Sequence, residues 1–184
     1  MFKLVNQVKV LSPEDKGVKD ILIAAEKIAA IEEPGKIKIE GLEVERIDGS
    51  GLVAIPGFID PHVHILGGGG EGGPATRAPE IRVEDCALAG VTSVIGCLGT
   101  DSITRHLSSL LAKARALEIE GLNAWIYVGA YNLPTPTITG SVRSDLVLID
   151  KVIGAGEIAL SDHRSSQPTY EDFLQLVAEC RVGG

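Results

Sequence analysis

After residue 51 the sequence alternates between apolar segments and helical segments, and this alternation constrains the fold more than any other feature. The apolar segments are expected to be strands at 52–60, 91–99, 124–131 and 157–162. The expected helices lie at about 79–89, 103–119, 144–153 and 169–181. Strands that are apolar on both faces need cover on both sides, and their alternation with helices is typical of a parallel sheet. The sequence therefore predicts four consecutive βα units.

The segment before residue 51 has a different pattern. Residues 2–48 read as short strands separated by turn signals, among them Glu26 and Lys27, and they are followed by a Gly-Ser-Gly sequence. We therefore expect a small all-β domain over residues 1–50 and a separate α/β domain over residues 51–184.

The expected α/β domain is too short for a complete (β/α)₈ barrel, which usually takes ~250 residues. Residues 51–184 suffice for about half of one, and the final CRVGG follows an expected helix rather than a closing element. The chain is therefore expected to be truncated relative to a whole barrel. An open parallel sheet is the alternative.

Composition excludes several classes of function. The chain is 45% hydrophobic with a formal net charge of −8, and it has no cluster of Lys and Arg, so neither nucleic acid nor a membrane surface is an expected partner. Export or membrane insertion is not expected, because the first 17 residues contain no apolar core of signal-peptide length and no run approaches about 18 apolar residues. Cys86, Cys97 and Cys180 are an odd number without a CxxC motif, which favours reduced thiols. We expect small-molecule chemistry in the cytoplasm.

Two histidines stand one residue apart at the end of the first apolar segment. Because side chains alternate along a strand, His62 and His64 should project to the same side. Imidazole nitrogens suit zinc and similar divalent ions, and catalytic metal sites keep one position open for water. Asp60-Pro61 before the pair and a glycine-rich segment after it leave little bulk against a ligand. A pair of hydrogen-bonded histidines that merely ends the strand is the alternative.

The sequence PGFIDPHVH resembles the first-strand motif of the amidohydrolase superfamily. Four further segments are similar, in this order, to isoaspartyl (β-aspartyl) dipeptidases: GGGGEGG, GCLGTD, VGAYNLPTPTITGSVRSD and SDHRSSQPTYEDF. The similarity extends over essentially the whole chain. It implies the N-terminal part of a (β/α)₈ TIM barrel preceded by part of a small β-sandwich. It also implies two divalent metal ions, expected to be zinc, with His62 and His64 as ligands of the more buried one.

The resemblance assigns substrate-binding roles to further residues. Glu71 would hold the substrate's α-ammonium, assisted by the backbone near Gly69 and the hydroxyl of Thr100. Tyr131 would donate its hydroxyl to the scissile carbonyl oxygen, and Arg164 would bind the α-carboxylate in a bidentate pair. Each residue type also has an ordinary structural role: a solvated loop glutamate, a barrel tyrosine with a hydrogen-bonded hydroxyl, or a surface salt bridge.

One position departs from the family pattern. The family often bridges its metals with a carboxylated lysine four residues before the serine of SDHR, and Glu157 stands there instead. We predict that Glu157 is a bridging metal ligand and that the site assembles without carbon dioxide, although a strand-end salt bridge would also explain this residue. His106, inside a helical segment, and His163 are not expected to be ligands.

The family also uses two further histidines and an aspartate from later strands, which this sequence does not contain. The resemblance implies hydrolysis of β-aspartyl dipeptides by metal-activated water, in an enzyme expected to be a homo-oligomer when complete. We expect the 184-residue chain to be inactive by itself. The alternatives are a dihydroorotase-like cyclic amidase, or a non-catalytic fragment that is stable only as an oligomer or with a partner chain.

Overall fold

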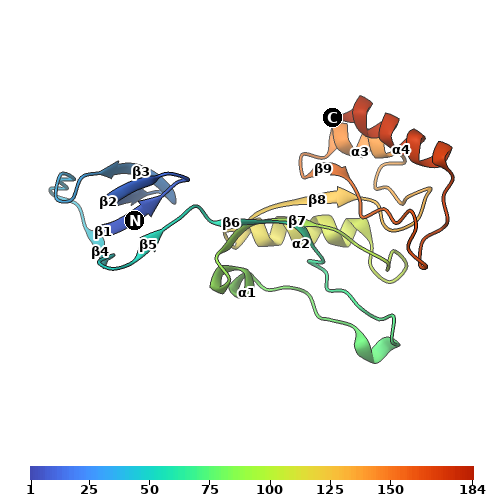
Figure 1. Cartoon of the computed structure of the whole chain (residues 1–184), viewed down its shortest axis with the longest axis horizontal. Helices are drawn as coiled ribbons and strands as arrows, with labels where there is room; N and C mark the ends of the chain where they lie inside the picture. The colour runs from blue at the N-terminus through green and yellow to red at the C-terminus, as the bar shows by residue number, and fades with distance from the viewer. The chain divides into compact units, whose positions relative to one another are not determined.

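The computed structural model describes all 184 residues, which form two compact units, Met1–Pro56 and Gly57–Gly184 (Figure 1). The first unit is a single mixed sheet in the order β3-β2-β1-β4, with β5 also pairing with β1. Its strands are β1 (Phe2–Leu11), β2 (Asp15–Ala24), β3 (Lys27–Glu32), β4 (Val44–Asp48) and β5 (Val53–Ala54). Its buried apolar side chains are Leu4, Val8, Val10 and Ile21, so its core is small.

The first apolar segment after residue 51 is not one strand. Within residues 52–60, Val53 and Ala54 form β5 and pair in parallel with Lys9 and Val10 of the first sheet, whereas the strand of the second unit begins only at Phe58. The expected strand 52–60 is therefore wrong as a single element. Pairing with β1 also explains why the first unit extends past residue 50, where we expected the boundary.

The second unit contains a four-stranded parallel sheet whose strand order follows the chain, β6-β7-β8-β9. The strands are β6 (Phe58–Val63), β7 (Val91–Gly96), β8 (Asn123–Val128) and β9 (Val152–Ala155). The helices are α1 (Val83–Leu88), α2 (Leu107–Ile119), α3 (Val142–Leu148) and α4 (Tyr170–Gly183), with a short 3₁₀ turn at Pro74–Thr76. The predicted α/β class with consecutive βα units is confirmed.

The helices cover one face of this sheet. Val94, Ala124, Ile126 and Val128 are fully buried on that face, and they pack in one cluster with helix residues such as Leu110. The alternate positions of the strands are more open: Ile59 and Ile153 are exposed, and Trp125 is half-buried. An apolar second face of this kind is typical of the inner side of a barrel. None of the helices combines the length and apolar character that crossing a membrane requires.

The fourth strand and the third helix differ from expectation. The structure has β9 at Val152–Ala155 and an irregular segment at 157–162, where we expected a strand. Helix α3 ends at Leu148, so the expected helix 144–153 is wrong in its second half. The run from Val152 is only four residues long and contains a glycine, which weakens its strand signal. The last helix begins with a side-chain cap, because the Thr169 side chain accepts a hydrogen bond from the Asp172 N–H.

Candidate metal centre

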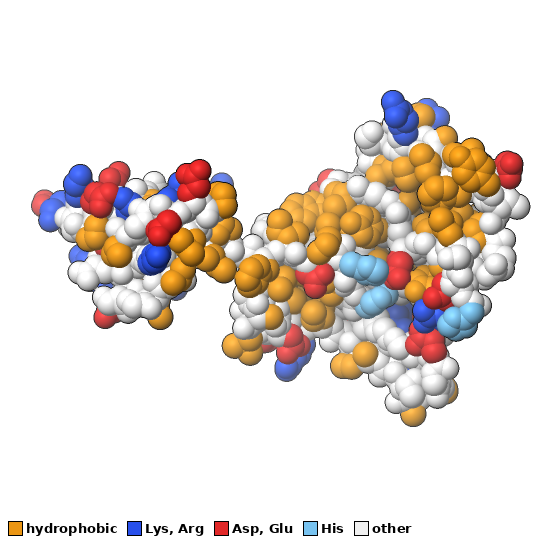
Figure 2. All heavy atoms as spheres, in the orientation of Figure 1, with side chains coloured by type: hydrophobic (Ala, Val, Ile, Leu, Met, Phe, Trp, Pro, Cys, Tyr) orange, Lys and Arg blue, Asp and Glu red, His pale blue; other side chains and the backbone are white.

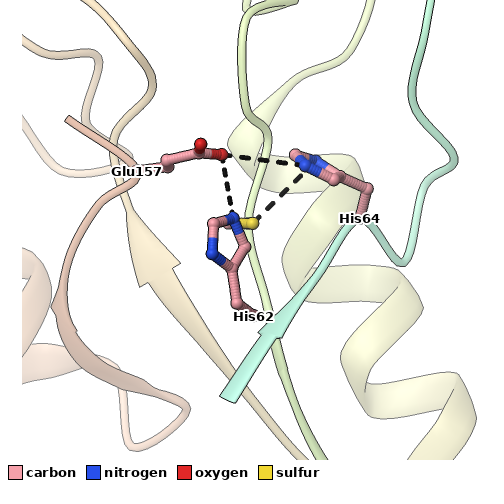
Figure 3. A group of neighbouring side chains, drawn as sticks. His62, His64 and Glu157 are labelled. Carbon is pink, nitrogen blue, oxygen red and sulfur yellow. Dashed lines mark hydrogen bonds and ion pairs between the residues drawn. The ribbon is translucent and has the colours of Figure 1, made fainter. Parts of the chain in front are cut away.

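Two imidazoles at the carboxyl end of β6 meet a carboxylate that follows β9 (Figure 3). His62 Nε2 lies 2.9 Å from Glu157 Oε2, and His64 Nε2 lies 3.7 Å from the same oxygen. The ring centroids of the two histidines are 5.6 Å apart. All three side chains are partly open to solvent, with Glu157 the least exposed at 26%. The structure thus brings the three candidate ligands of the sequence analysis together.

The sheet explains how residues from its two outer strands meet. Strands β7 and β8 separate β6 from β9, and three strand spacings amount to roughly 14 Å in a flat sheet. Both side chains must therefore extend toward one another over the same face. Gly154 on β9 leaves room for the ring of Tyr127 on β8, because a Cβ there would lie 3.2 Å from Cδ1 of that ring.

Cys97 adds a fourth possible donor, which the sequence analysis did not select. Ligand atoms of His62, His64, Cys97 and Glu157 all lie within 4.8 Å of one another. The Cys97 thiol is buried, lies 3.7 Å from the carbonyl oxygen of Val63, and has a pKa raised to about 12, chiefly by burial and secondly by Glu157. Strand alternation could have indicated it, because Cys97 continues the face of β7 opposite to buried Val94. Imidazole, carboxylate and thiolate are the donors that zinc accepts, so the group fits a zinc ion.

Gly99 sets the space available to His64, which gives a first prediction. Gly99 has φ +70°, and a Cβ there would lie 2.3 Å from His64 Cε1. We expect Gly99→Ala to displace the imidazole and to weaken zinc binding by on the order of 10-fold to 100-fold. Competition with a chelating indicator measures the zinc affinity.

Gly41→Ala is the matched control for this substitution. Gly41 has φ +71°, so it carries the same backbone strain, but no atom lies within 4 Å of its Cβ position. An equal loss of zinc affinity in both variants would mean that the His64 contact has no part in the effect.

The remaining candidate residues gather beside this group. A cavity of about 100 Å³ is lined by His64, Gly69, Glu71, Thr100, Tyr131, Glu157 and Arg164, together with Gly68, Leu98, Asp101 and Arg105. All of the sequence-predicted site residues except His62 therefore line one cavity, next to the histidine pair. The histidines and acidic side chains at this site are visible together on the surface in Figure 2. A larger hollow of about 190 Å³ near α3 and α4 contains none of these residues.

Glu71 and Arg164 form an ion pair in the cavity wall. Arg164 Nη1 donates to Glu71 Oε1 over 3.1 Å, and the Thr100 hydroxyl donates to the same oxygen over 3.1 Å. Hydrogen bonds from its own backbone N–H and from Thr100, with Arg164 nearby, lower the pKa of Glu71. Gly69 is part of the same loop, and a Cβ at this position would lie 2.5 Å from the carbonyl oxygen of Thr76.

Tyr131 connects the ion pair to the histidine group. Arg164 Nη2 lies 3.3 Å from the Tyr131 hydroxyl, and the guanidinium carbon lies 5.2 Å from the ring centroid. Burial and, secondly, the Glu157 carboxylate raise the pKa of Tyr131. Asp162 holds the other edge of the guanidinium through Nε at 2.9 Å. Glu71, Arg164, Tyr131 and Glu157 therefore line the same cavity.

The other two histidines lie outside this group. His106 is exposed at the N-cap of α2, and the side chain of His163 is 85% exposed beside Asp162. Neither belongs to the metal-ligand group.

Comparison with solved structures gives the relatives of this chain. Two crystal structures of beta-aspartyl dipeptidase from Fervidobacterium islandicum AW-1 match the whole chain at 55% sequence identity, with TM-scores of 0.94 and 0.93. One of them is a complex with the dipeptide beta-Asp-Leu. This chain is a relative of the beta-aspartyl dipeptidases. The family resemblance inferred from the sequence is confirmed, and the chain spans 50% and 48% of the two beta-aspartyl dipeptidase chains.

More distant relatives lie in the same amidohydrolase superfamily as the beta-aspartyl dipeptidases. A dihydroorotase from Elusimicrobium minutum is 45% identical over 74 residues, which are 39% of this chain and 16% of the dihydroorotase. One from Streptococcus pyogenes is 28% identical over 163 residues, which are 86% of this chain and 35% of that enzyme. A D-hydantoinase structure, 23% identical with a TM-score of 0.55, shares the fold. No family model matches the chain.

Proposed function

We propose that the protein hydrolyses β-aspartyl dipeptides with zinc as its metal, using the cavity at the carboxyl ends of β6 to β9. The observation that carries this proposal is the position of the Glu71–Arg164 ion pair in the same cavity as His64 and Glu157. The similarity to beta-aspartyl dipeptidase over the whole chain supports it. The residues for binding a small zwitterion thus lie beside a group that suits a metal ion.

The spacing of the ion pair fits the amino-acid end of such a substrate. In a β-aspartyl dipeptide, the α-ammonium and the α-carboxylate are bonded to one carbon, so they are close neighbours. Glu71 and Arg164, 3.1 Å apart, are close enough to bind these two groups at the same time. A carboxylate suits the ammonium, and a planar guanidinium suits the carboxylate. The substrate would exchange one internal ion pair for two intermolecular pairs.

The proposed chemistry takes place two carbons away from that substrate carbon, at the side-chain carbonyl. A divalent metal ion, when bound, polarises a carbonyl and lowers the pKa of a water molecule toward 7. His62, His64 and Glu157 would hold such ions. Tyr131, next to Arg164, would donate its phenolic hydrogen to the carbonyl oxygen as negative charge develops there. A phenol keeps its proton at neutral pH and is therefore able to act as this donor.

A substrate comparison tests the proposal. The full-length protein is taken here as this chain together with the later strands that the family resemblance implies. We expect it, when loaded with zinc, to hydrolyse β-Asp-Leu with a kcat/KM at least on the order of 100-fold above that for dihydroorotate, because the latter has no ammonium for Glu71 to bind. Steady-state kinetics with both compounds measures the ratio. A preference for dihydroorotate would contradict the proposal.

A cyclic amidase is the second candidate, because the curated relatives named above are dihydroorotases. The same kinetic comparison decides between the two. We further propose a cytoplasmic location, which the three unpaired cysteines support. Assembly into a homo-oligomer and inactivity of the 184-residue chain alone stay predictions.

A further inference from the structure

The loop that carries Glu71 has little stiffness of its own. Residues 67–73 are all glycine except Glu71, and four of these glycines have positive φ. Glycine loses more conformational freedom on ordering than any other residue. The position of the Glu71 carboxylate must therefore be fixed by contacts from outside the loop.

Arg105 makes such contacts from a buried position just before α2. It is 6% exposed. Its Nε donates to the carbonyl oxygen of Leu66 and its Nη2 to that of Gly68, each over 3.1 Å, while Nη1 donates to Asp101 Oδ2 over 3.0 Å. One rigid guanidinium therefore ties two backbone carbonyls at the start of the glycine loop to the segment that follows β7.

Asp101 holds the Arg105 guanidinium in place and also contacts Arg77, which follows the glycine loop. It accepts from the N–H of Thr104 over 2.8 Å and of Ile103 over 3.1 Å, and from Arg77 Nη1 over 3.3 Å. Arg77 itself forms a β-bridge with Gly69. Burial acts to raise the pKa of Asp101, but these hydrogen bonds and Arg105 lower it to about 2, so the carboxylate is charged at neutral pH. The Asp101 carboxylate thus connects Arg105, which binds the start of the glycine loop, with Arg77, which pairs with Gly69.

The same segment also touches Glu71 directly, because Thr100 precedes Asp101 and donates to Glu71 Oε1. We propose that Arg105, paired with Asp101, is a positioning residue for substrate selection: it holds the glycine loop so that Glu71 faces the cavity beside Arg164. This role rests on the proposed function. Arg105 acts through the loop because three of its N–H groups are already committed to Leu66, Gly68 and Asp101.

Arg105→Lys in the full-length zinc protein tests the role, because lysine keeps the charge and loses the fork of donors. We expect KM for β-Asp-Leu to rise at least about 10-fold while kcat stays within about 3-fold and the zinc content is unchanged. In a Glu71→Gln background the same substitution should raise KM less than about 2-fold, because its effect passes through Glu71. Fully additive effects, or a loss of zinc, would overturn the proposal.

Hydrogen exchange provides a measurement that needs no activity. The amides of residues 67–73 should exchange at least about 10-fold faster in Arg105→Lys, and unchanged exchange there would refute the positioning role. Arg82→Lys is the control, since Arg82 is exposed on the surface and pairs with Asp85. Failure of the parent protein to cleave β-Asp-Leu would defeat the proposed function alone, because the exchange result still decides what Arg105 does.

Discussion

Replacing Glu157 with glutamine is expected to lower kcat/KM for β-Asp-Leu by on the order of 1,000-fold and to reduce the zinc content of the full-length protein from two ions to at most one. The physical reason is the position of the carboxylate. Its Oε2 faces both histidines, and Figure 3 shows the other oxygen directed away from them. A carboxylate in this position could bind two ions through its two oxygens. A neutral amide has only one good donor atom for a metal and no charge.

Metal analysis together with kinetics measures this effect, and Glu84→Gln is the control because Glu84 lies in the first turn of α1, away from the cavity. If Glu157→Gln retained two zinc ions and full activity, the bridging role would be refuted. Loss of activity with two ions retained would instead assign Glu157 to the chemistry without making it a bridge.

Removing either charge of the Glu71–Arg164 pair is expected to raise KM for β-Asp-Leu by on the order of 100-fold. Glu71→Gln leaves the substrate ammonium without its anion, and Arg164→Met leaves the carboxylate without its fork of donors. Zinc content should not change in either variant, because neither residue belongs to the metal-ligand group. Steady-state kinetics with β-Asp-Leu provides the measurement.

A second substrate serves as the control for these two variants. Hydrolysis of an uncharged amide that lacks both groups should be nearly insensitive to the two substitutions, because it has nothing for either charge to bind. Equal losses on both substrates would show that the pair supports the structure of the cavity and not the selection of the zwitterion.

The fold class was predictable because its signal is repeated along the chain. Alternating apolar and helical segments indicated the parallel sheet, and three of the four expected strand positions overlap β6, β7 and β8. The fourth failed because β9 is only four residues long and contains Gly154, whereas the longer segment 157–162 includes the apolar residues 158–160 and was therefore predicted as the strand. The expected boundary between the two units at residue 50 differs from the observed one for a related reason. Nothing in the local sequence reveals that Val53 pairs with Lys9.

The candidate site was predictable only where its residues belong to a recognisable sequence motif. His62, His64, Glu71 and Arg164 stand in segments similar to the family pattern, and the structure places them around one cavity or at its edge. Arg105 has no comparable signal, because a buried arginine that binds backbone carbonyls can be recognised only once the loop and its partner are both in place. The spacing of Cys97 from the other cysteines indicates only a reduced thiol, whereas its proximity to His64 depends on the pairing of two strands.

His62 and Glu157 are 95 positions apart in the sequence but 2.9 Å apart in space, with His62 near the end of the first strand of the sheet and Glu157 just after the last. An ion held between them would act as a removable cross-link around three βα units, one that an unfolded chain is poorly able to form. We therefore expect the supply of metal in the cell to influence how much of this polypeptide stays folded and escapes degradation, in addition to how fast it turns over substrate.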